Sequence, residues 1–574
     1  MSFKSIKEAL KQGNLLFQKM SVVSANAQSN VNQYSLPDWQ YFIANSLLWR
    51  QALNGNIKGK RVLIPTSVGG LSAATILEGM LGVAMTLRGA QIRFLLCDGV
   101  LPACLQVHAG KVKQTNVITD YKLKSQVCPG CIARGDAAYK PTGLPISYYS
   151  DFINETERES LRDLASGIPL KEIRAYQQDG VALGEHAFAG TLRFFACGHL
   201  PETGEAENVL RRYFEAALIT NLVMGRVLAE HAPEVALFHH GIYVPQGIIG
   251  EVCRKRGVRV VNWQVGYRKK CFIFSHRETY HHTLISEPTS NWEDISWNER
   301  LDAETTAYLK SRWYGSNDWI WFHEQPKHEA EAITKETGID FSKPTITLLT
   351  NVFWDAQLHF KANAFGDMLD WLLKTIEYFK HRPDLQLAIR IHPAEVRGAI
   401  PSRQPLVAEV ERVFPELPPN VYLIPPESQV STYGLCENSD SVIIFGTKTG
   451  VELTAMGIPV VVAGEAWIRN KGITLDATSP DSYFSLLDTL PLNKRLSPEQ
   501  TERAKKYAFH FFFRRFVPIN FMEPSADGVP YKVNIKDLGD LMPGRDGGLD
   551  VVCSGILEGS EFIFPAETYM GVAV

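Results

Sequence analysis

The side chains best suited to chemistry in this sequence stand directly after short apolar runs. In the segment SVIIFGTKTGVELTAMGIPVVV (residues 441–462), a buried-type strand ends at Phe445, and a turn rich in glycine and threonine leads into a helix. The turn and the first helical turn supply four polar side chains: Thr447, Lys448, Thr449 and Glu452. Free backbone N–H groups, hydroxyls and a lysine suit a phosphate, and a glutamate suits a ribose diol. The segment therefore predicts a nucleotide site, with a self-satisfied helix cap as the alternative.

A histidine–proline pair lies upstream of this segment. The strand-like run 386–391 ends in His392-Pro393-Ala394-Glu395. Because Pro393 restricts the turn, we expect His392 at the carboxyl edge of the strand. Imidazole can donate a hydrogen bond near neutral pH to a leaving group that gains charge. Taken alone, the pair is as well explained by a structural histidine, but together with residues 441–462 it favours a phosphate contact.

These two segments resemble the donor half of GT-B glycosyltransferases, where a turn holds phosphate and a glutamate at a helix start holds ribose. More narrowly, they are similar to capsule-polysaccharide-synthesis transferases and bacterial sialyltransferases, although this chain has threonines where several of those proteins have serine. The resemblance implies that His392 and Glu395 bind the donor together with the four side chains of the turn. It favours a CMP-activated acidic sugar, such as Kdo or a nonulosonic acid, and it implies that no catalytic metal is needed.

Two adjacent histidines, His239 and His240, follow an apolar run in the N-terminal half. A transferase that inverts configuration needs a general base for the acceptor hydroxyl, and histidine suits the pKa range. Successive strand residues point to opposite faces, so we expect only one of the two to face a cleft, and we choose His240. Asp98, which follows another predicted strand, is the rival base, with Glu251 and His276 next. A capping or packed role is the alternative for each histidine.

A further polar stretch follows the first predicted strand of the C-terminal half. Asn351, Asp355 and Gln357 could line a cleft there, and Trp354 could stack on a base or a sugar. A capped helix start with a core tryptophan explains the same residues equally well. We therefore rank this stretch second among the candidate binding segments.

Four of the nine cysteines lie close together in the sequence: Cys97, Cys104, Cys128 and Cys131. The pair in Cys128-Pro129-Gly130-Cys131 has the spacing of a metal knuckle, whereas the first pair is spaced more widely than most zinc sites. We predict a structural zinc ion here, with an iron–sulfur cluster as the second choice. A redox pair at 128 and 131, or four ordinary thiols, are the alternatives.

The predicted elements place these residues in two α/β domains of Rossmann type that face a cleft. Strand, turn, helix and strand recur in each half, and ligands of open parallel sheets bind beyond the carboxyl ends of the strands. We expect five segments: a helical appendage at 1–56, an acceptor-side domain at 57–285, a linker at 286–330, a donor-binding domain at 331–515 and a tail at 516–574.

The composition limits the function further. Hydrophobic residues make up 45% of the chain, charged residues 21%, and the net charge is −3, so a general nucleic-acid binder is not expected. No apolar run is long enough to span a membrane, which leads us to expect a cytoplasmic protein and leaves open a peripheral contact with the inner membrane. We predict a glycosyltransferase that moves a sugar from a nucleotide sugar to a glycan or lipid-linked saccharide. A sugar-nucleotide epimerase and a non-catalytic binding subunit are the alternatives.

Overall fold

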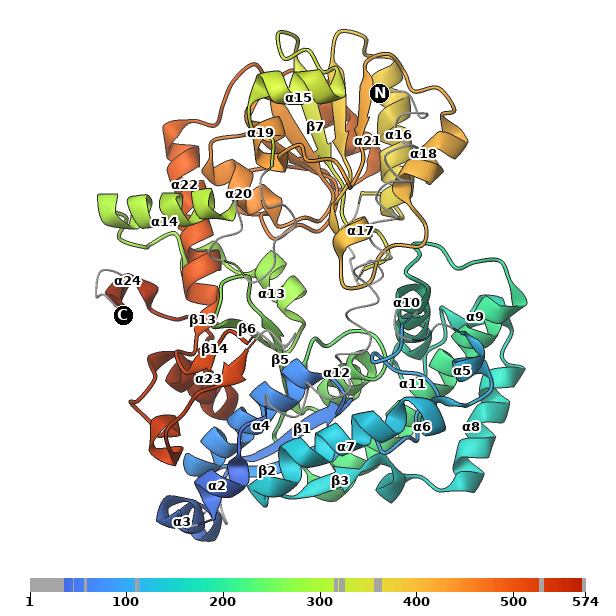
Figure 1. The fold of residues 1–574 in the computed structure, drawn as a ribbon, viewed down its shortest axis with the longest axis vertical. Helices are drawn as coiled ribbons and strands as arrows, with labels where there is room; N and C mark the ends of the chain where they lie inside the picture. Colours follow the sequence, from blue (N-terminus) through green and yellow to red (C-terminus); the bar gives the residue numbers. More distant parts are fainter. Residues whose placement is uncertain are drawn as a thin grey trace.

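Two α/β domains, each built around its own sheet, lie one above the other in the view of Figure 1. The computed structural model describes residues 36–44, 46–55, 59–108, 112, 114–313, 318, 326–355, 364–525 and 531–569. Residues 1–35 of the expected N-terminal appendage lie outside the described residues. The expected fold class, two Rossmann-like domains that face a cleft, is confirmed by the two sheets described below.

The N-terminal sheet has seven strands in the order β13-β6-β5-β4-β1-β2-β3. Their bounds are β1 (Arg61–Ser67), β2 (Gln91–Leu96), β3 (Ile146–Tyr148), β4 (Val235–His239), β5 (Arg259–Val265), β6 (Cys271–His276) and β13 (Val517–Pro518). The five strands from β3 to β5 are parallel, whereas β6 and β13 run antiparallel to their neighbours. The chain reverses its direction of growth between β1 and β4, which is where such sheets bind ligands.

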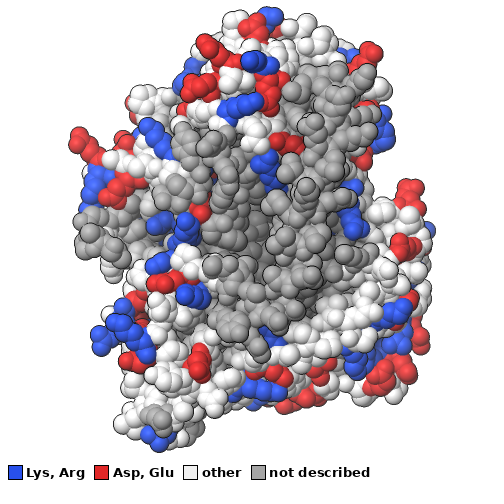
Figure 2. Space-filling view, in the orientation of Figure 1, with Lys and Arg blue, Asp and Glu red and all other residues white. Residues whose placement is uncertain are grey.

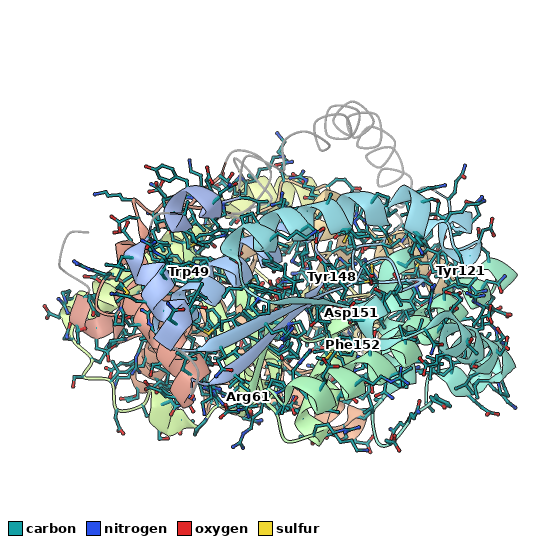
Figure 3. The ribbon with its side chains drawn as sticks, turned by 90° about the horizontal axis from the view of Figure 1, so that it is seen from below. Trp49, Arg61, Tyr121, Tyr148, Asp151 and Phe152 are labelled. Carbon is teal, nitrogen blue, oxygen red and sulfur yellow. The ribbon has the colours of Figure 1, made fainter. Side chains whose placement is uncertain are left out.

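Helices cover both faces of this sheet: α4 (Ser72–Leu87), α5 (Asn116–Thr119), α6 (Leu123–Gln126), α7 (Cys128–Tyr139), α8 (Glu155–Gly167), α9 (Leu170–Ile173), α10 (Leu183–Phe195), α11 (Gly204–His231), α12 (Gln246–Lys255) and α13 (Tyr280–Ser286). The short helices α2 (Trp39–Ile43) and α3 (Leu47–Gly55) precede them. The longest, α11, begins where the Thr203 side chain accepts a hydrogen bond from the Ala206 N–H, and it ends at Ala232 in the left-handed region. Figure 3 looks onto this domain from below, with Arg61 at the amino end of β1 and Tyr148 at the carboxyl end of β3.

The C-terminal sheet has six strands, all parallel, in the order β12-β11-β10-β7-β8-β9. Their bounds are β7 (Thr345–Leu349), β8 (Gln386–Arg390), β9 (Val421–Ile424), β10 (Ser441–Ile444), β11 (Val460–Val462) and β12 (Leu475–Asp476). Every residue of β7, β8 and β10 is buried, because helices cover both faces of a parallel sheet. The direction of growth reverses between β7 and β10, so this sheet has the same kind of crevice as the N-terminal one.

The remaining helices are α14 (Glu299–Arg312), α15 (Ala330–Thr337), α16 (Met368–Lys380), α17 (Ala394–Arg397), α18 (Leu406–Val413), α19 (Thr432–Glu437), α20 (Thr449–Ala455), α21 (Pro480–Leu487) and α22 (Pro498–Phe509). Most of them surround the C-terminal sheet, while α22 runs back toward the N-terminal domain (Figure 1). A π-helical stretch, η5 (His510–Arg515), continues α22 and leads into β13.

Residues beyond 516 add to the N-terminal domain. They form β13, the hairpin of β14 (Met522–Glu523) and β15 (Lys532–Val533), and the helices α23 (Gly547–Glu558) and α24 (Ala566–Tyr569). Arg88, the residue that follows α4, forms an ion pair with Asp550 of α23 at 2.6 Å. The segment that the sequence marks as a tail thus completes a sheet edge, which its lack of periodicity did not indicate.

A loop after α10 bridges the two domains on one side of the cleft. Gln404 Oε1 accepts hydrogen bonds from the Gly198 and His199 N–H groups at 3.1 and 3.2 Å. His199 Nε2 lies 3.4 Å from Asp367 Oδ2, and this hydrogen bond raises the pKa of the imidazole. We call these contacts the latch.

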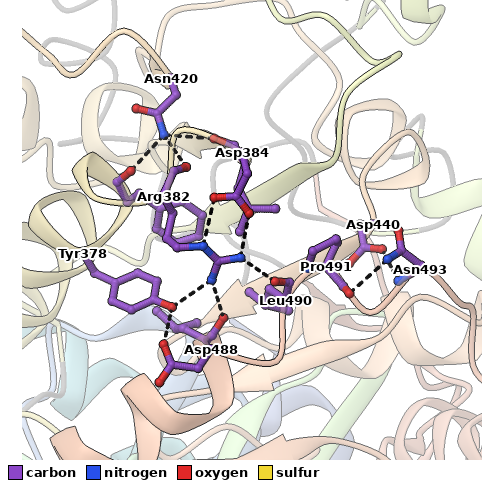
Figure 4. Close-up of polar contacts among 12 residues, drawn as sticks. Tyr378, Arg382, Asp384, Asn420, Asp440, Asp488, Leu490, Pro491 and Asn493 are labelled. Atoms are coloured by element: carbon purple, nitrogen blue, oxygen red, sulfur yellow. Dashed lines mark hydrogen bonds and ion pairs between the residues drawn. The ribbon is translucent and has the colours of Figure 1, made fainter.

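The residues just before the C-terminal strands β8, β9 and β10, at the amino ends of these strands, hold a separate polar network (Figure 4). Arg382 forms a two-pronged contact with Asp384 at 3.0 and 2.8 Å, and Asp440 accepts from the Asn493 N–H at 2.7 Å. These groups satisfy one another, which gives the network a structural role. Side chains near these strand ends therefore serve below as controls for the site.

On the face drawn in Figure 2, basic and acidic side chains of the described residues are interspersed. The near-neutral charge of the whole chain agrees with that picture. Among the described residues, no helix combines the length and the apolar character that crossing a bilayer requires.

Candidate functional site

A cavity of about 650 Å³ lies between the carboxyl ends of the two sheets. Its lining includes residues that follow β4 and β5 on the N-terminal side and residues that follow β7, β8 and β10 on the C-terminal side. Both crevices predicted by strand order thus open into one space. We call its two sides the N-terminal wall and the C-terminal wall.

The turn after β10 forms the centre of the C-terminal wall, and Gly446, Thr447, Lys448 and Thr449 all line the cavity. The Thr447 and Thr449 hydroxyls lie 3.1 Å apart, and the Gly446 N–H donates to Asn351 Oδ1 at 3.3 Å. The link to Asn351 joins the ends of β10 and β7 across the switch point. The turn therefore presents two adjacent hydroxyls and a lysine to any ligand that enters the cavity.

His392 stands beside this turn on the same wall. Its backbone N–H donates to the Thr350 hydroxyl at 3.0 Å, and its Nδ1 accepts from the Ala394 N–H at 3.0 Å. In a neutral imidazole, an accepting Nδ1 leaves the proton on Nε2. The ring is therefore held as a hydrogen-bond donor, which is the form expected from the sequence.

Glu452 lies behind the turn and does not appear among the cavity-lining residues. Its carboxylate contacts Lys448 Nζ at 2.8 Å, Arg312 Nε at 3.2 Å and the Tyr433 hydroxyl, and it is 1% exposed. Burial opposes ionisation, but Arg312 and Lys448 outweigh burial and lower its pKa to about 2. In this structure the carboxylate holds the cationic side chains of the wall in place, and its expected contact with ribose stays a prediction.

Arg312 is a functional candidate that the sequence analysis missed. It comes from α14, in the expected linker, and it lines the cavity while it forms an ion pair with Asp318. Lys448 also lies 4.7 Å from the centre of the Tyr267 ring. No local motif marks Arg312, because its partners come from segments far apart in the sequence.

Glu395 does not reach the cavity either. It is 2% exposed, its Oε1 accepts from the Leu406 N–H at 3.1 Å, and burial raises its pKa to about 8. The short helix α17 turns this side chain toward α18, whereas His392 one turn earlier faces the cavity. The expected donor contact of Glu395 is therefore not supported by its position.

Both His239 and His240 line the N-terminal wall. The expectation that only one of them faces the cleft is wrong, because strand alternation ends at His239. His240 adopts the left-handed region, with φ of 67°, which turns the chain out of β4. His239 Nε2 pairs with Gln264 Oε1 at 2.8 Å, and burial lowers the pKa of His239 to about 4.

A buried glutamate beneath these histidines was also missed. Glu78 of α4 has no exposed surface, and its Oε1 accepts from the His239 N–H at 2.9 Å and from Trp263 Nε1 at 2.8 Å. Its other oxygen accepts from the Thr66 hydroxyl. Glu78 thus joins the carboxyl ends of β1, β4 and β5. Its signal in the sequence is a lone carboxylate inside an otherwise apolar helix.

Asp98, the rival base, is not among the residues that line the cavity. Its carboxylate accepts from the Ser150 N–H at 3.2 Å. The strand before it, β2, lies one position farther from the switch point than β1, so its carboxyl end lies farther along the same edge of the sheet than the ends of β4 and β5 that line the cavity. Of the two candidate bases, only His240 lines the cavity. The reserve candidates Glu251 and His276 are likewise not among the lining residues; Glu251 pairs with His186 at 2.7 Å.

Of the four side chains singled out after β7, Asn351 and Asp355 line the cavity. Asp355 Oδ1 accepts from the Tyr243 hydroxyl at 2.6 Å, which links the two walls. Trp354 is 7% exposed and donates from Nε1 to the Ser402 hydroxyl at 3.0 Å, so it packs in the domain instead of lining the cavity. Gln357 lies outside the described residues.

The four clustered cysteines do not form a ligand set. Within the described ranges, no three His, Cys, Asp or Glu side chains are arranged to hold a metal ion. Cys131 Sγ accepts from the Gly70 N–H at 3.0 Å, and burial raises the pKa of Cys97 to about 12 and that of Cys128 to about 11. Cys97, Cys104, Cys128 and Cys131 would have to move together to bind zinc or a cluster, and that site stays a prediction.

Comparison with known proteins gives one family match. Residues 306–485 match the family described as "Capsule polysaccharide biosynthesis protein", and this span, about a third of the chain, contains Arg312, His392 and the turn at 446–449. The match confirms the resemblance inferred from residues 386–395 and 441–462. No curated protein is significantly similar to this chain.

Solved structures show only distant likeness. The β-Kdo 2,4 transferase of KpsC from Thermosulfurimonas dismutans is 12% identical, with 50% of this chain and 87% of that one covered and a TM-score of 0.32. The β-Kdo 2,7 transferase of the same protein is 13% identical, with 56% and 88% covered and a TM-score of 0.31. UDP-GlcNAc 2-epimerase from Neisseria meningitidis is 13% identical, with 59% and 81% covered and a TM-score of 0.23. Likenesses this distant do not assign an activity.

Proposed function

We propose that this chain is a glycosyltransferase of surface polysaccharide synthesis. A nucleotide sugar binds the C-terminal wall, and a hydroxyl of a glycan or lipid-linked saccharide acceptor approaches from the N-terminal wall. The observation that carries the proposal is a single cavity that has a histidine, two hydroxyls and a lysine on one side and a histidine pair on the other. The family match over residues 306–485 supports the same reading.

In the proposed reaction, the acceptor oxygen attacks the anomeric carbon of the donor while the bond from that carbon to the phosphate oxygen breaks. His240 takes the proton of the acceptor hydroxyl. Nε2–H of His392, the Thr447 and Thr449 hydroxyls and the Lys448 ammonium stabilise the negative charge that develops on the phosphate. Because α20 is short, this stabilisation is assigned to side chains and not to a helix dipole.

The donor is proposed to be CMP-linked, with an acidic sugar such as Kdo or a nonulosonic acid. Arg312 and Lys448 support this choice because they bring positive charge to the cavity, although Glu452 and Asp318 balance much of it. We further propose that the enzyme works in the cytoplasm, with a peripheral contact at the inner membrane, where a lipid-linked acceptor is available.

A thermal-shift screen with CMP, CDP, UDP, GDP and dTDP tests the donor site. A nucleotide that binds only the folded protein raises its melting temperature. At a nucleotide concentration a hundredfold above Kd, the added stabilisation is about 2.7 kcal/mol of unfolding free energy. We expect CMP to give the largest shift, and His392→Ala to reduce it. His381→Ala is the matched control, since His381 is exposed near the amino ends of the same sheet.

If none of the five nucleotides raises the melting temperature, the proposal is wrong. A shift with UDP in place of CMP corrects the donor but keeps the site. Turnover of a sugar nucleotide in the absence of any acceptor indicates an epimerase instead. Binding without turnover of any kind, with a full set of acceptors, indicates a non-catalytic subunit.

A further inference from the structure

The N-terminal wall of the cavity differs in chemistry from the C-terminal wall. Its lining comes mainly from the ends of β4 and β5 and from α13, with Ala73 of α4, Tyr267, and Ile273 of β6, and within the described part of the chain it contains no Asp, Glu, Lys or Arg. The charged residues that line the cavity, Arg312, Asp318, Asp355, Arg390 and Lys448, all come from beyond residue 311. The N-terminal wall thus contributes no charge of its own, although Lys448 Nζ and the Arg312 guanidinium reach it at 4.7 and 5.4 Å from the centre of the Tyr267 ring.

Four aromatic rings lie together in the lining of the cavity. The Tyr280 and His281 ring centres lie 4.1 Å apart, and the Trp467 ring lies 5.3 Å from His281 and 5.9 Å from Tyr280. Tyr267 lies 6.4 Å from Trp467 on the other side. Trp467 follows β11 in the C-terminal domain, so the two domains build this aromatic surface together.

A row of neutral hydrogen-bonding groups runs beside the rings. Gln264 accepts from His239 Nε2 at 2.8 Å, and Gln264 and Tyr280 both line the cavity. Burial lowers the pKa of His239 to about 4 and that of His281 to about 3, so both imidazoles are neutral near pH 7. The row therefore offers amide, hydroxyl and imidazole groups without a net charge.

We propose that the N-terminal wall is an acceptor subsite for an uncharged sugar ring, which stacks on Tyr280, His281 and Trp467 and bonds to Gln264 and His239. This inference rests on the proposed glycosyltransferase function and adds the class of acceptor. The C–H face of a pyranose is weakly positive and apolar, so it suits an aromatic face, while its hydroxyls need neutral partners. A sugar carboxylate over Tyr280 and His281 would lose its hydration and be repelled by the Asp355 carboxylate, whose charge also acts on Tyr280, while Arg312 and Lys448 are already paired with Glu452.

The test compares methyl glycosides that differ in charge, in the presence of the nucleotide that gives the largest thermal shift. The neutral probes are the methyl β-glycosides of galactose and N-acetylglucosamine, and the acidic probes are those of glucuronic acid and N-acetylneuraminic acid. We expect the wild-type protein to bind a neutral probe at least about tenfold more tightly than either acidic probe, as measured by calorimetry.

Two variants then test whether the neutral probe binds to the aromatic rings. Tyr280→Ala should weaken the neutral probe by about tenfold or more, whereas Tyr280→Phe, which keeps the ring, should change it only a few-fold. Tyr41→Ala, a change at a residue 75% exposed on α2, is the remote control. The nucleotide-induced thermal shift of each variant reports whether it is folded.

The outcomes separate the two proposals. If no nucleotide binds, the glycosyltransferase proposal fails. If nucleotide binds but the acidic probes bind as tightly as the neutral ones or more tightly, or if neither class binds, the neutral subsite is refuted while the donor site stands. The preference of the wild-type protein for neutral over acidic probes tests the neutral subsite even if Tyr280→Ala does not fold.

Discussion

Replacing Glu78 by glutamine is expected to stabilise the protein above neutral pH. The carboxyl group is fully buried, and burial raises its pKa from 4.5 to about 7 even though Thr66, Trp263 and the His239 N–H donate hydrogen bonds to it. The folded protein therefore keeps a proton that the unfolded chain has lost between these two pH values. Stability contributed by this group is fully present below pH 4.5 and is lost as pH rises through 7.

The size of the loss follows from the shift in pKa. A difference of about 2.5 units corresponds to about 3 kcal/mol of unfolding free energy by pH 8. Glutamine has nearly the shape of the protonated acid. Its Oε1 can accept from the His239 N–H and Trp263 Nε1, and its Nε2 can donate to the Thr66 hydroxyl, so the variant keeps the contacts without the charge.

Melting curves of the wild-type protein and Glu78→Gln at about pH 5 and about pH 8.5 measure the effect. We expect similar melting temperatures at the lower pH and an advantage of roughly 5 °C for the variant at the higher pH. Glu78→Ala is the control: it leaves buried donors without an acceptor and should destabilise at both pH values. A Glu78→Gln variant whose difference from wild type does not depend on pH would refute the reasoning.

Three further predictions test other groups. Glu452→Gln should change stability in the opposite direction. The low pKa of Glu452 contributes stability above pH 4.5 that is lost toward pH 2, so the variant should lose about 3–5 kcal/mol of unfolding free energy at pH 7. The same melting assay measures this loss, and no loss would show that the ion pairs are not formed. His240→Ala should lower kcat by about 10²–10⁴-fold without weakening the binding of the nucleotide. Full activity of this variant would show that His240 is not the general base. The hydrogen bond to Asp367 raises the pKa of His199, so the charged contact between them, and with it the latch, should weaken as pH rises from about 5.5 to about 8.5 and the imidazole loses its proton. Small-angle scattering should show that the wild-type protein expands over this pH range and that His199→Ala does not.

Metal analysis tests the cysteine prediction. Freshly reduced protein should contain about one zinc ion per chain if Cys97, Cys104, Cys128 and Cys131 close around it. Visible absorbance in a brown protein would indicate an iron–sulfur cluster instead. Protein without either would leave four ordinary thiols, in agreement with their present arrangement.

Local sequence determined the parts of this protein that depend on chain neighbours. An apolar run followed by Gly446 and Thr447 dictates a strand, a turn and a helix, because backbone propensities and burial act over a few residues. The same holds for His392, where the proline after it sets the turn. The turn at 446–449 and the position of His392 on the C-terminal wall were therefore predictable from residues 386–395 and 441–462, and the two-domain architecture from the recurrence of strand, turn and helix in each half.

Tertiary structure alone decided which of these side chains meet. The order of strands in the sheet excluded Asp98, and the left-handed backbone at His240 brought both histidines into the cleft. The partners of Glu452 and Glu78 come from strands and helices far apart in the chain, and contacts of that kind leave no periodic trace in the sequence. The physical reason is that a buried charge depends on three-dimensional neighbours, whereas a turn or a strand depends on the residues beside it.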